Sequence, residues 1–267
     1  MKRMLWFLAI GLGLATGAIW AAPGAPQGEV TPSNGDIIRK AEQSLVLILV
    51  GDGSGGVRSV CTGVIIRADG IVLAPYHPLK GAQEVQVRLR DGEVYDQVNL
   101  IGFDERRDVA AVQIPASGLT ALSGAAAEET QAGDKIHVLS ADEKMMWSTN
   151  EGVLGQVRLA DEVPGAGHGY RVIQFMALIS QSTQGGALLN SRGQLLGIIT
   201  GSPQIGGQQF AVPLEGVAGL PVQGMRTALG TGKNLALPTV SSAPGATAEE
   251  HGSPLAVLAK ARSLRDL

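Results

Sequence analysis

The sequence predicts an all-β protein in which many short strands form a sandwich or a barrel. Short runs rich in Val, Ile and Leu recur from residue 46 to residue 214. Gly or Asp-Gly breaks, such as Asp69-Gly70 and Asp91-Gly92, separate many of these runs, and helical periodicity is almost absent. The runs fall into two sets of similar size on either side of the Ala-rich stretch from Gly124 to Glu129, which predicts two similar units.

The individual strands are expected where the apolar runs lie. Alternation is clearest at residues 85–90, where Val, Val and Leu alternate with Gln, Arg and Arg, the pattern of a strand with one buried face. In the first unit we expect strands at residues 46–50, 60–66, 71–73, 85–89, 94–101 and 109–114. In the second unit we expect strands at residues 136–139, 153–159, 172–175, 195–200 and 210–214.

The N-terminal end differs from the strand-rich part. Residues 1–22 have the features of a secretory signal peptide, because Lys2 and Arg3 precede an apolar run that ends in small residues. An uncleaved membrane anchor is the alternative. Residues 23–43 form an N-terminal segment, in which Asp36 is expected to cap a short helix that reaches residue 43.

The C-terminal end, residues 223–267, is expected to be a linker and a tail. Residues 239–247 are rich in Ser, Ala, Pro and Gly, a composition typical of a linker that does not fold. Ser253 and the proline after it predict the start of a short helix that runs to the end of the chain. This tail is too short to hold a further domain.

Composition excludes several classes of function. The formal net charge is −3 and basic residues do not cluster, which argues against binding to nucleic acid or to an anionic membrane surface. Cys61 is the single cysteine, so no intramolecular disulfide forms, and its apolar neighbours predict a buried thiol. One cysteine and four scattered histidines leave no zinc site, and no cofactor is expected.

A series of motifs follows one another in a recognisable order. His77 comes after the segments Thr-Gly-Val-Ile-Ile (62–66) and Asp-Gly-Ile-Val-Leu (69–73). Farther along lie Asp-Val-Ala-Ala-Val (108–112), Gly-Gly (185–186), Gly-Gln-Leu-Leu-Gly-Ile (193–198) and Phe-Ala-Val-Pro (210–213). In this order and spacing the motifs resemble the protease domain of the HtrA/Deg-type periplasmic serine proteases, which have the trypsin-like fold.

The resemblance implies a chymotrypsin/trypsin-like double β-barrel over residues 44–222. Two six-stranded barrels would occupy about 44–123 and 130–222, with the active site in the cleft between them. It also assigns His77 as the general base and Asp108, 31 residues later, as the carboxylate that fixes the histidine's tautomer and orientation.

Gln184 stands at the position where this family carries its nucleophilic serine. The family motif is Gly-Asn-Ser-Gly-Gly, whereas this chain reads Ser-Thr-Gln-Gly-Gly at residues 182–186. A side-chain amide has no ionisable proton to give to a histidine and no useful nucleophilicity. Ser182 replaces a glycine whose N–H the family uses in its oxyanion hole, and a side chain there disfavours the required backbone conformation. Ser182 is itself the alternative nucleophile, if the turn shifts by two residues.

Three functions remain open at this point. The first is a catalytically inactive pseudoprotease that binds an extended peptide or an unfolded protein segment between the barrels by strand addition. The second is an active serine endopeptidase that uses Ser182, and the third is a structural domain with no ligand. The signal peptide predicts a periplasmic or secreted protein that does not contact the membrane after cleavage, and the oligomeric state is not predicted.

Overall fold

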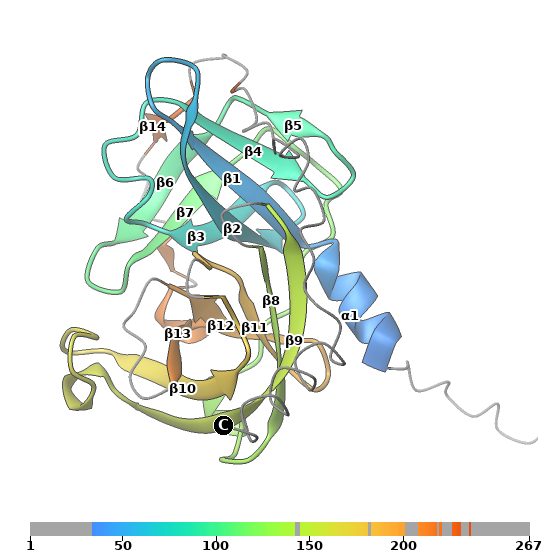
Figure 1. The fold of residues 1–267 in the computed structure, drawn as a ribbon, viewed down its shortest axis with the longest axis vertical. Helices are drawn as coiled ribbons and strands as arrows, with labels where there is room; N and C mark the ends of the chain where they lie inside the picture. The colour runs from blue at the N-terminus through green and yellow to red at the C-terminus, as the bar shows by residue number, and fades with distance from the viewer. Residues whose placement is uncertain are drawn as a thin grey trace, which may run out of the picture. The chain divides into compact units, whose positions relative to one another are not determined.

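Figure 1 shows the fold in a computed structural model of the chain. Every described helix and strand lies between residues 34 and 228. The signal peptide, Ser182 and the predicted C-terminal helix lie outside the described residues, and no described helix is long and apolar enough to span a membrane. The described residues are 34–141, 145–180, 183–200, 208–217, 219–220, 226–230 and 235.

Seven strands from the first half of the chain, together with β14 from near its C-terminal end, form an eight-stranded antiparallel sheet with the order β14-β6-β7-β3-β2-β1-β4-β5. The run predicted as one strand at 94–101 is two strands, separated at residues 96–98, where the Val98 carbonyl accepts from the Leu229 N–H. The strands are β1 (Leu45–Gly51), β2 (Val57–Arg67), β3 (Ile71–Pro75), β4 (Val85–Leu89), β5 (Val94–Tyr95), β6 (Asn99–Asp104), β7 (Val109–Gln113) and β14 (Thr227–Ala228).

The second half forms a closed six-stranded barrel with the order β10-β13-β12-β11-β8-β9. Sequence analysis missed β11, whose four residues follow a Gly-Gly pair directly and are too few to show a pattern. The strands are β8 (Lys135–Ala141), β9 (Trp147–Leu159), β10 (Arg171–Ala177), β11 (Ala187–Asn190), β12 (Leu195–Ile199) and β13 (Gln209–Pro213). Short 3-10 turns lie at η1 (Ala127–Glu129), η2 (Ala160–Glu162) and η3 (Leu214–Gly216). The predicted all-β double barrel is confirmed, although the first sheet has eight strands rather than six.

The predicted N-terminal helix is present as α1 (Asn34–Glu42), but it starts before Asp36. Asp36 therefore lies in the first turn, where it pairs with Arg39, and the prediction that it caps the helix is wrong. At the other end of α1, the Glu42 carboxylate accepts from Arg90 at 3.4 Å and from the Thr149 hydroxyl at 2.9 Å. Because these partners lie beside β4 and on β9, the end of α1 contacts both barrels.

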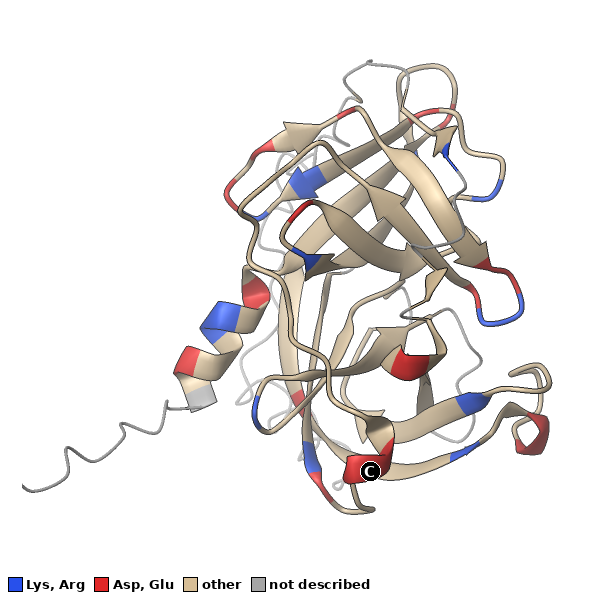
Figure 2. Cartoon of the chain, turned by 180° about the vertical axis from the view of Figure 1, so that it is seen from behind, with Lys and Arg blue, Asp and Glu red and all other residues tan. Residues whose placement is uncertain are grey.

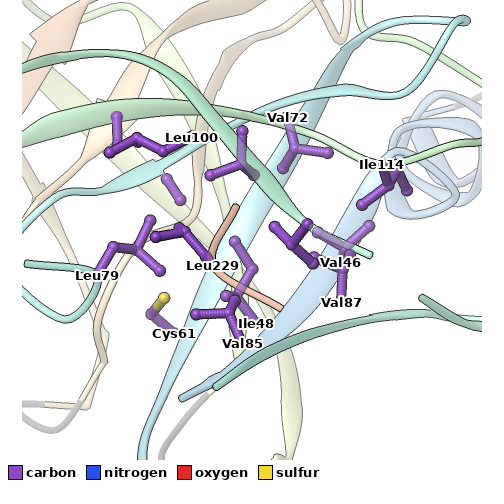
Figure 3. Close-up of a cluster of buried hydrophobic side chains, with 14 of the residues drawn as sticks. Val46, Ile48, Cys61, Val72, Leu79, Val85, Val87, Leu100, Ile114 and Leu229 are labelled. Carbon is purple, nitrogen blue, oxygen red and sulfur yellow. The ribbon is translucent and has the colours of Figure 1, made fainter. Parts of the chain in front are cut away.

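Burial on both faces explains why several strands are continuous apolar runs. In β3, Val72 and Ala74 face the core of the first barrel, which Figure 3 shows in close-up, whereas Ile71 and Leu73 face a second apolar cluster. This second cluster also contains residues of β8, β11, β12 and β13, so it is the interface between the two barrels. The interior of the second barrel is a third cluster, built from the alternate residues of the same strands.

Residues 226–230 were expected to belong to a linker, but they return to the first barrel. β14 pairs with β6, and Leu229 continues the contact by donating its N–H to Val98 and accepting from Val85 of β4. The Leu229 side chain is 4% exposed within the core of the first barrel. This short segment therefore bridges β6 and β4 across the open side of the sheet, a pairing that no local pattern reveals.

Leu229→Ala should lower the free energy of unfolding by about 2–5 kcal/mol, because it leaves a cavity in the barrel core. Thr227→Ala in the same segment is the matched control, because this side chain is exposed and the backbone pairing to β6 is kept. We expect the control to change stability by no more than about 0.5 kcal/mol. Urea unfolding of both variants checks the expectation, and equal stabilities would show that the segment is only loosely attached.

Candidate active site

The pairing of β3 with β7 brings His77 and Asp108 together. Pro75 at the end of β3 pairs with Val109 at the start of β7, so the residues just beyond this pair are neighbours. Asp108 accepts two hydrogen bonds from His77, with its Oδ1 2.7 Å from the backbone nitrogen and its Oδ2 2.7 Å from Nδ1. The carboxylate thus fixes the ring so that Nε2 is the nitrogen left for another partner.

Asp108 adopts a backbone conformation that few side chains accept. Its φ is +55°, in the left-handed region, where Asp and Asn are enriched among non-glycine residues. The preceding turn is stabilised by Asp104, whose Oδ1 accepts from the backbone N–H groups of Arg106 and Arg107. The strained conformation sits directly at the histidine contact, as such conformations often do at functional sites.

Electrostatics favour the protonated form of His77. The hydrogen bond and the negative charge of Asp108 raise the pKa of His77 above its ordinary value, and a side-chain hydrogen bond with Gln184 raises it further. Partial burial lowers the pKa, but the sum is an increase. The His77 side chain is 47% exposed, so the ring remains open to solvent and to a ligand.

The turn before β11 requires glycine at two successive positions. Gly185 has φ +78° and Gly186 has φ +128°, both in the region that favours glycine. A Cβ atom on Gly185 would lie 2.1 Å from the Thr62 carbonyl oxygen, and one on Gly186 would lie 2.7 Å from that of Leu139. The two barrels approach this turn so closely that no side chain fits on either glycine. The backbone position of Gln184, the residue just before the pair, is therefore fixed.

Gln184 therefore projects from this turn towards the first barrel. Its carbonyl accepts from the Thr62 N–H at 2.7 Å, and its side-chain Oε1 accepts a long hydrogen bond of 3.3 Å from the Ser59 hydroxyl of β2. The same side chain is the hydrogen-bond partner that raises the pKa of His77. The structure thus brings His77, Asp108 and Gln184 together, while Ser182 lies outside the described residues.

Sequence reasoning did not identify Ser59. It lies in β2 two residues before Cys61, within a segment whose side chains alternate between the two faces of the strand. Nothing in the sequence distinguishes this serine from other strand serines, since its contact with Gln184 spans 125 residues of chain. Only the packing of one barrel on the other brings the two side chains together.

Cys61 is a core residue beside the site rather than part of it. The thiol is 1% exposed among the apolar side chains shown in Figure 3, as the sequence predicted. Burial, with the negative charge of Asp108 as a second cause, raises the pKa of the thiol to about 12, so it stays protonated and unreactive. In the part of the chain that the structure describes, no group of three or more His, Cys, Asp or Glu side chains is arranged to hold a metal ion.

Comparison with known proteins identifies the family. Residues 61–198, just over half of the chain, match the family described as "Trypsin-like peptidase domain". The chain belongs to this family. The structure of "HtrA-type protease AlgW with tripeptide" superposes with a TM-score of 0.60 and 26% identity, covering 69% of this chain and 60% of that one.

The chain is also similar to curated HtrA-type proteases. "Serine endoprotease DegS" from Haemophilus influenzae is 29% identical and is aligned over 60% of this chain and 48% of its own length. "Probable periplasmic serine protease do/HhoA-like" from the same organism is 32% identical over 65% of this chain and 38% of its own length. The predicted resemblance to the HtrA/Deg proteases is thereby confirmed, although the chain spans less than half of these two relatives.

Asp108→Asn should lower the pKa of His77, because it removes the negative charge that favours the protonated ring. Asparagine has nearly the same size as aspartate and tolerates the positive φ of this position. An NMR titration of the His77 ring in both proteins measures the change. Asp161→Asn is the matched control, since Asp161 contacts a different histidine, His168, at 3.2 Å. A pKa of His77 that stays unchanged in Asp108→Asn would contradict the contact described above.

Proposed function

We propose that this trypsin-like domain is an exported pseudoprotease that binds an extended peptide or a partner segment in the cell envelope. The observation that carries the proposal is the amide of Gln184 within hydrogen-bonding reach of His77, at the place where this family presents a serine hydroxyl. Such an amide supplies no nucleophile to the His77–Asp108 pair. Loss of the nucleophile alone costs about 10⁶-fold in kcat in subtilisin, roughly 8 kcal/mol.

Binding in place of catalysis is supported by the surface around the site. His77 and Gln184 are partly exposed, so they remain accessible to a ligand. Two large apolar side chains that precede Gln184 in the sequence, Met176 and Leu178, are 56% and 86% exposed. Exposed apolar side chains are typical of surfaces that bind other molecules when they form a patch. The structures of AlgW that resemble this chain contain a tripeptide or a decapeptide.

Export to the cell envelope is supported by the predicted signal peptide and by relatives whose names include the word periplasmic. The surface supports a protein rather than a nucleic-acid partner. In the described part of the chain, Figure 2 shows Lys and Arg interspersed with Asp and Glu along both barrels. A phosphate backbone would require a concentration of Lys and Arg side chains.

An activity-based phosphonate probe should not label the purified protein, because the residue at the nucleophile position has no hydroxyl. Labelling is read by intact-protein mass spectrometry, with an active HtrA-type protease as the positive control. Labelling that disappears in Ser182→Ala would overturn the proposal in favour of an active serine endopeptidase that uses Ser182. Crosslinking of partners from envelope extract, followed by competition with peptides, tests the binding half of the proposal.

Gln184→Ser should restore little peptidase activity by itself. Ser182 stands where the family has a glycine of the oxyanion hole, and removing one oxyanion donor in subtilisin costs on the order of 10²–10³ in kcat. The double variant Ser182→Gly with Gln184→Ser should therefore recover far more activity, and the two effects should be strongly non-additive. Values of kcat/KM on one peptide substrate compare the variants, and equal activity in both would show that Ser182 is harmless.

A further inference from the structure

The polar groups at the exposed side of His77 are unequally divided between donors and acceptors. Both carboxylate oxygens of Asp108 are occupied by His77. The Oε1 atom of Gln184 accepts from the Ser59 hydroxyl, and the Gln184 side chain also interacts with His77 and raises the pKa of the ring. Among the described residues no acceptor is found for the two N–H groups of the Gln184 amide. The groups of Gln184 that remain available to a ligand are therefore donors.

The protonation state of His77 depends on its partner Asp108. Asp108 is the only charged group, in the described part of the chain, whose charge perturbs the pKa of His77. The nearby Cys61 thiol is neutral, and Lys80 on the same loop is paired with Glu105. Arg58 of β2 donates to the carbonyl of Pro78 at 3.1 Å and adds a positive charge next to the histidine loop. A protonated His77 thus neutralises Asp108, and its ring N–H is a charged donor at the site.

A carboxylate satisfies this arrangement better than a peptide carbonyl. Hydrogen bonds between two charged partners are roughly twice as strong as those between neutral ones, so an anionic oxygen competes with Gln184 Oε1 for the ring N–H. In such a complex Gln184 keeps its bond from Ser59 and donates its amide N–H to the second carboxylate oxygen. In a peptide, a free carboxylate attached directly to the main chain is found only at the C-terminus.

We propose that the His77–Gln184 pair binds the C-terminal carboxylate of the peptide ligand. This inference rests on the proposed peptide-binding function and specifies which part of the peptide the site recognises. Glutamine then acts as a donor where the family has a nucleophile, and the protonated ring of His77, held by Asp108, acts as a charged donor. No bond is made or broken in this role.

Two small ligands that differ only at their end group test the inference. N-acetyl-trialanine carries the free carboxylate and its C-terminal amide does not, and both are titrated while the His77 ring signals are followed by NMR. At about pH 6, where a histidine of raised pKa is largely protonated, the acid should bind about tenfold more tightly than the amide. The bound acid should also raise the pKa of His77 further, so the preference is lost as the pH rises through that raised value.

Two variants test whether the preference for the acid ligand depends on Gln184. Gln184→Ala removes the amide donors and should reduce the preference for the acid several-fold, whereas His168→Gln should leave it unchanged, since His168 is an exposed histidine paired with Asp161 elsewhere. Equal binding of acid and amide would overturn the carboxylate inference and leave peptide binding intact. No response of His77 to either ligand would overturn the inference together with the proposed peptide site.

Discussion

Thr62 of the first barrel forms hydrogen bonds with two segments of the second barrel beside the site. Its N–H donates to the carbonyl of Gln184 at 2.7 Å, and its hydroxyl, which is fully buried, accepts from the N–H of Ala141 at 2.8 Å. Strand β2 of the first barrel is thereby held both to the turn before β11 and to the end of β8. The absence of side chains on Gly185 and Gly186 permits this close approach. The position of Gln184 relative to His77 depends on this junction.

The side chain at position 184 decides whether His77 faces a hydroxyl or an amide. A hydroxyl at position 184 would present a nucleophile to a histidine that Asp108 already orients. The amide instead links Ser59 and His77 by hydrogen bonds and stabilises the protonated ring. The chain thus keeps the contact between His77 and Asp108 and places an amide, rather than a hydroxyl, at the following position of the site.

The sequence predicted those features that depend on local patterns. Alternation and Gly breaks located most strands, and the order of motifs predicted that His77, Asp108 and Gln184 meet. It did not predict β14 or Ser59, because their partners lie far away in the chain and are chosen by packing. The hydrogen bonds of Glu42 with Arg90 and Thr149 likewise join residues that are far apart in the sequence. The Arg90 guanidinium also lies over the ring of Trp147, 4.6 Å from its centroid. Such contacts follow from the assembled barrels and leave no periodicity in the sequence.

The most direct test of this account is a crystal structure of the protein at a resolution that identifies the side chain facing His77. The account predicts that the Gln184 amide lies about 3 Å from Nε2 of His77, with Gly185 and Gly186 in the turn against Thr62 and Leu139. A turn shifted by two residues, with the Ser182 hydroxyl at Nε2 and Gln184 directed away, would contradict it. In that case the chain would present a nucleophile to its histidine, and the assignment as a binding protein would fail.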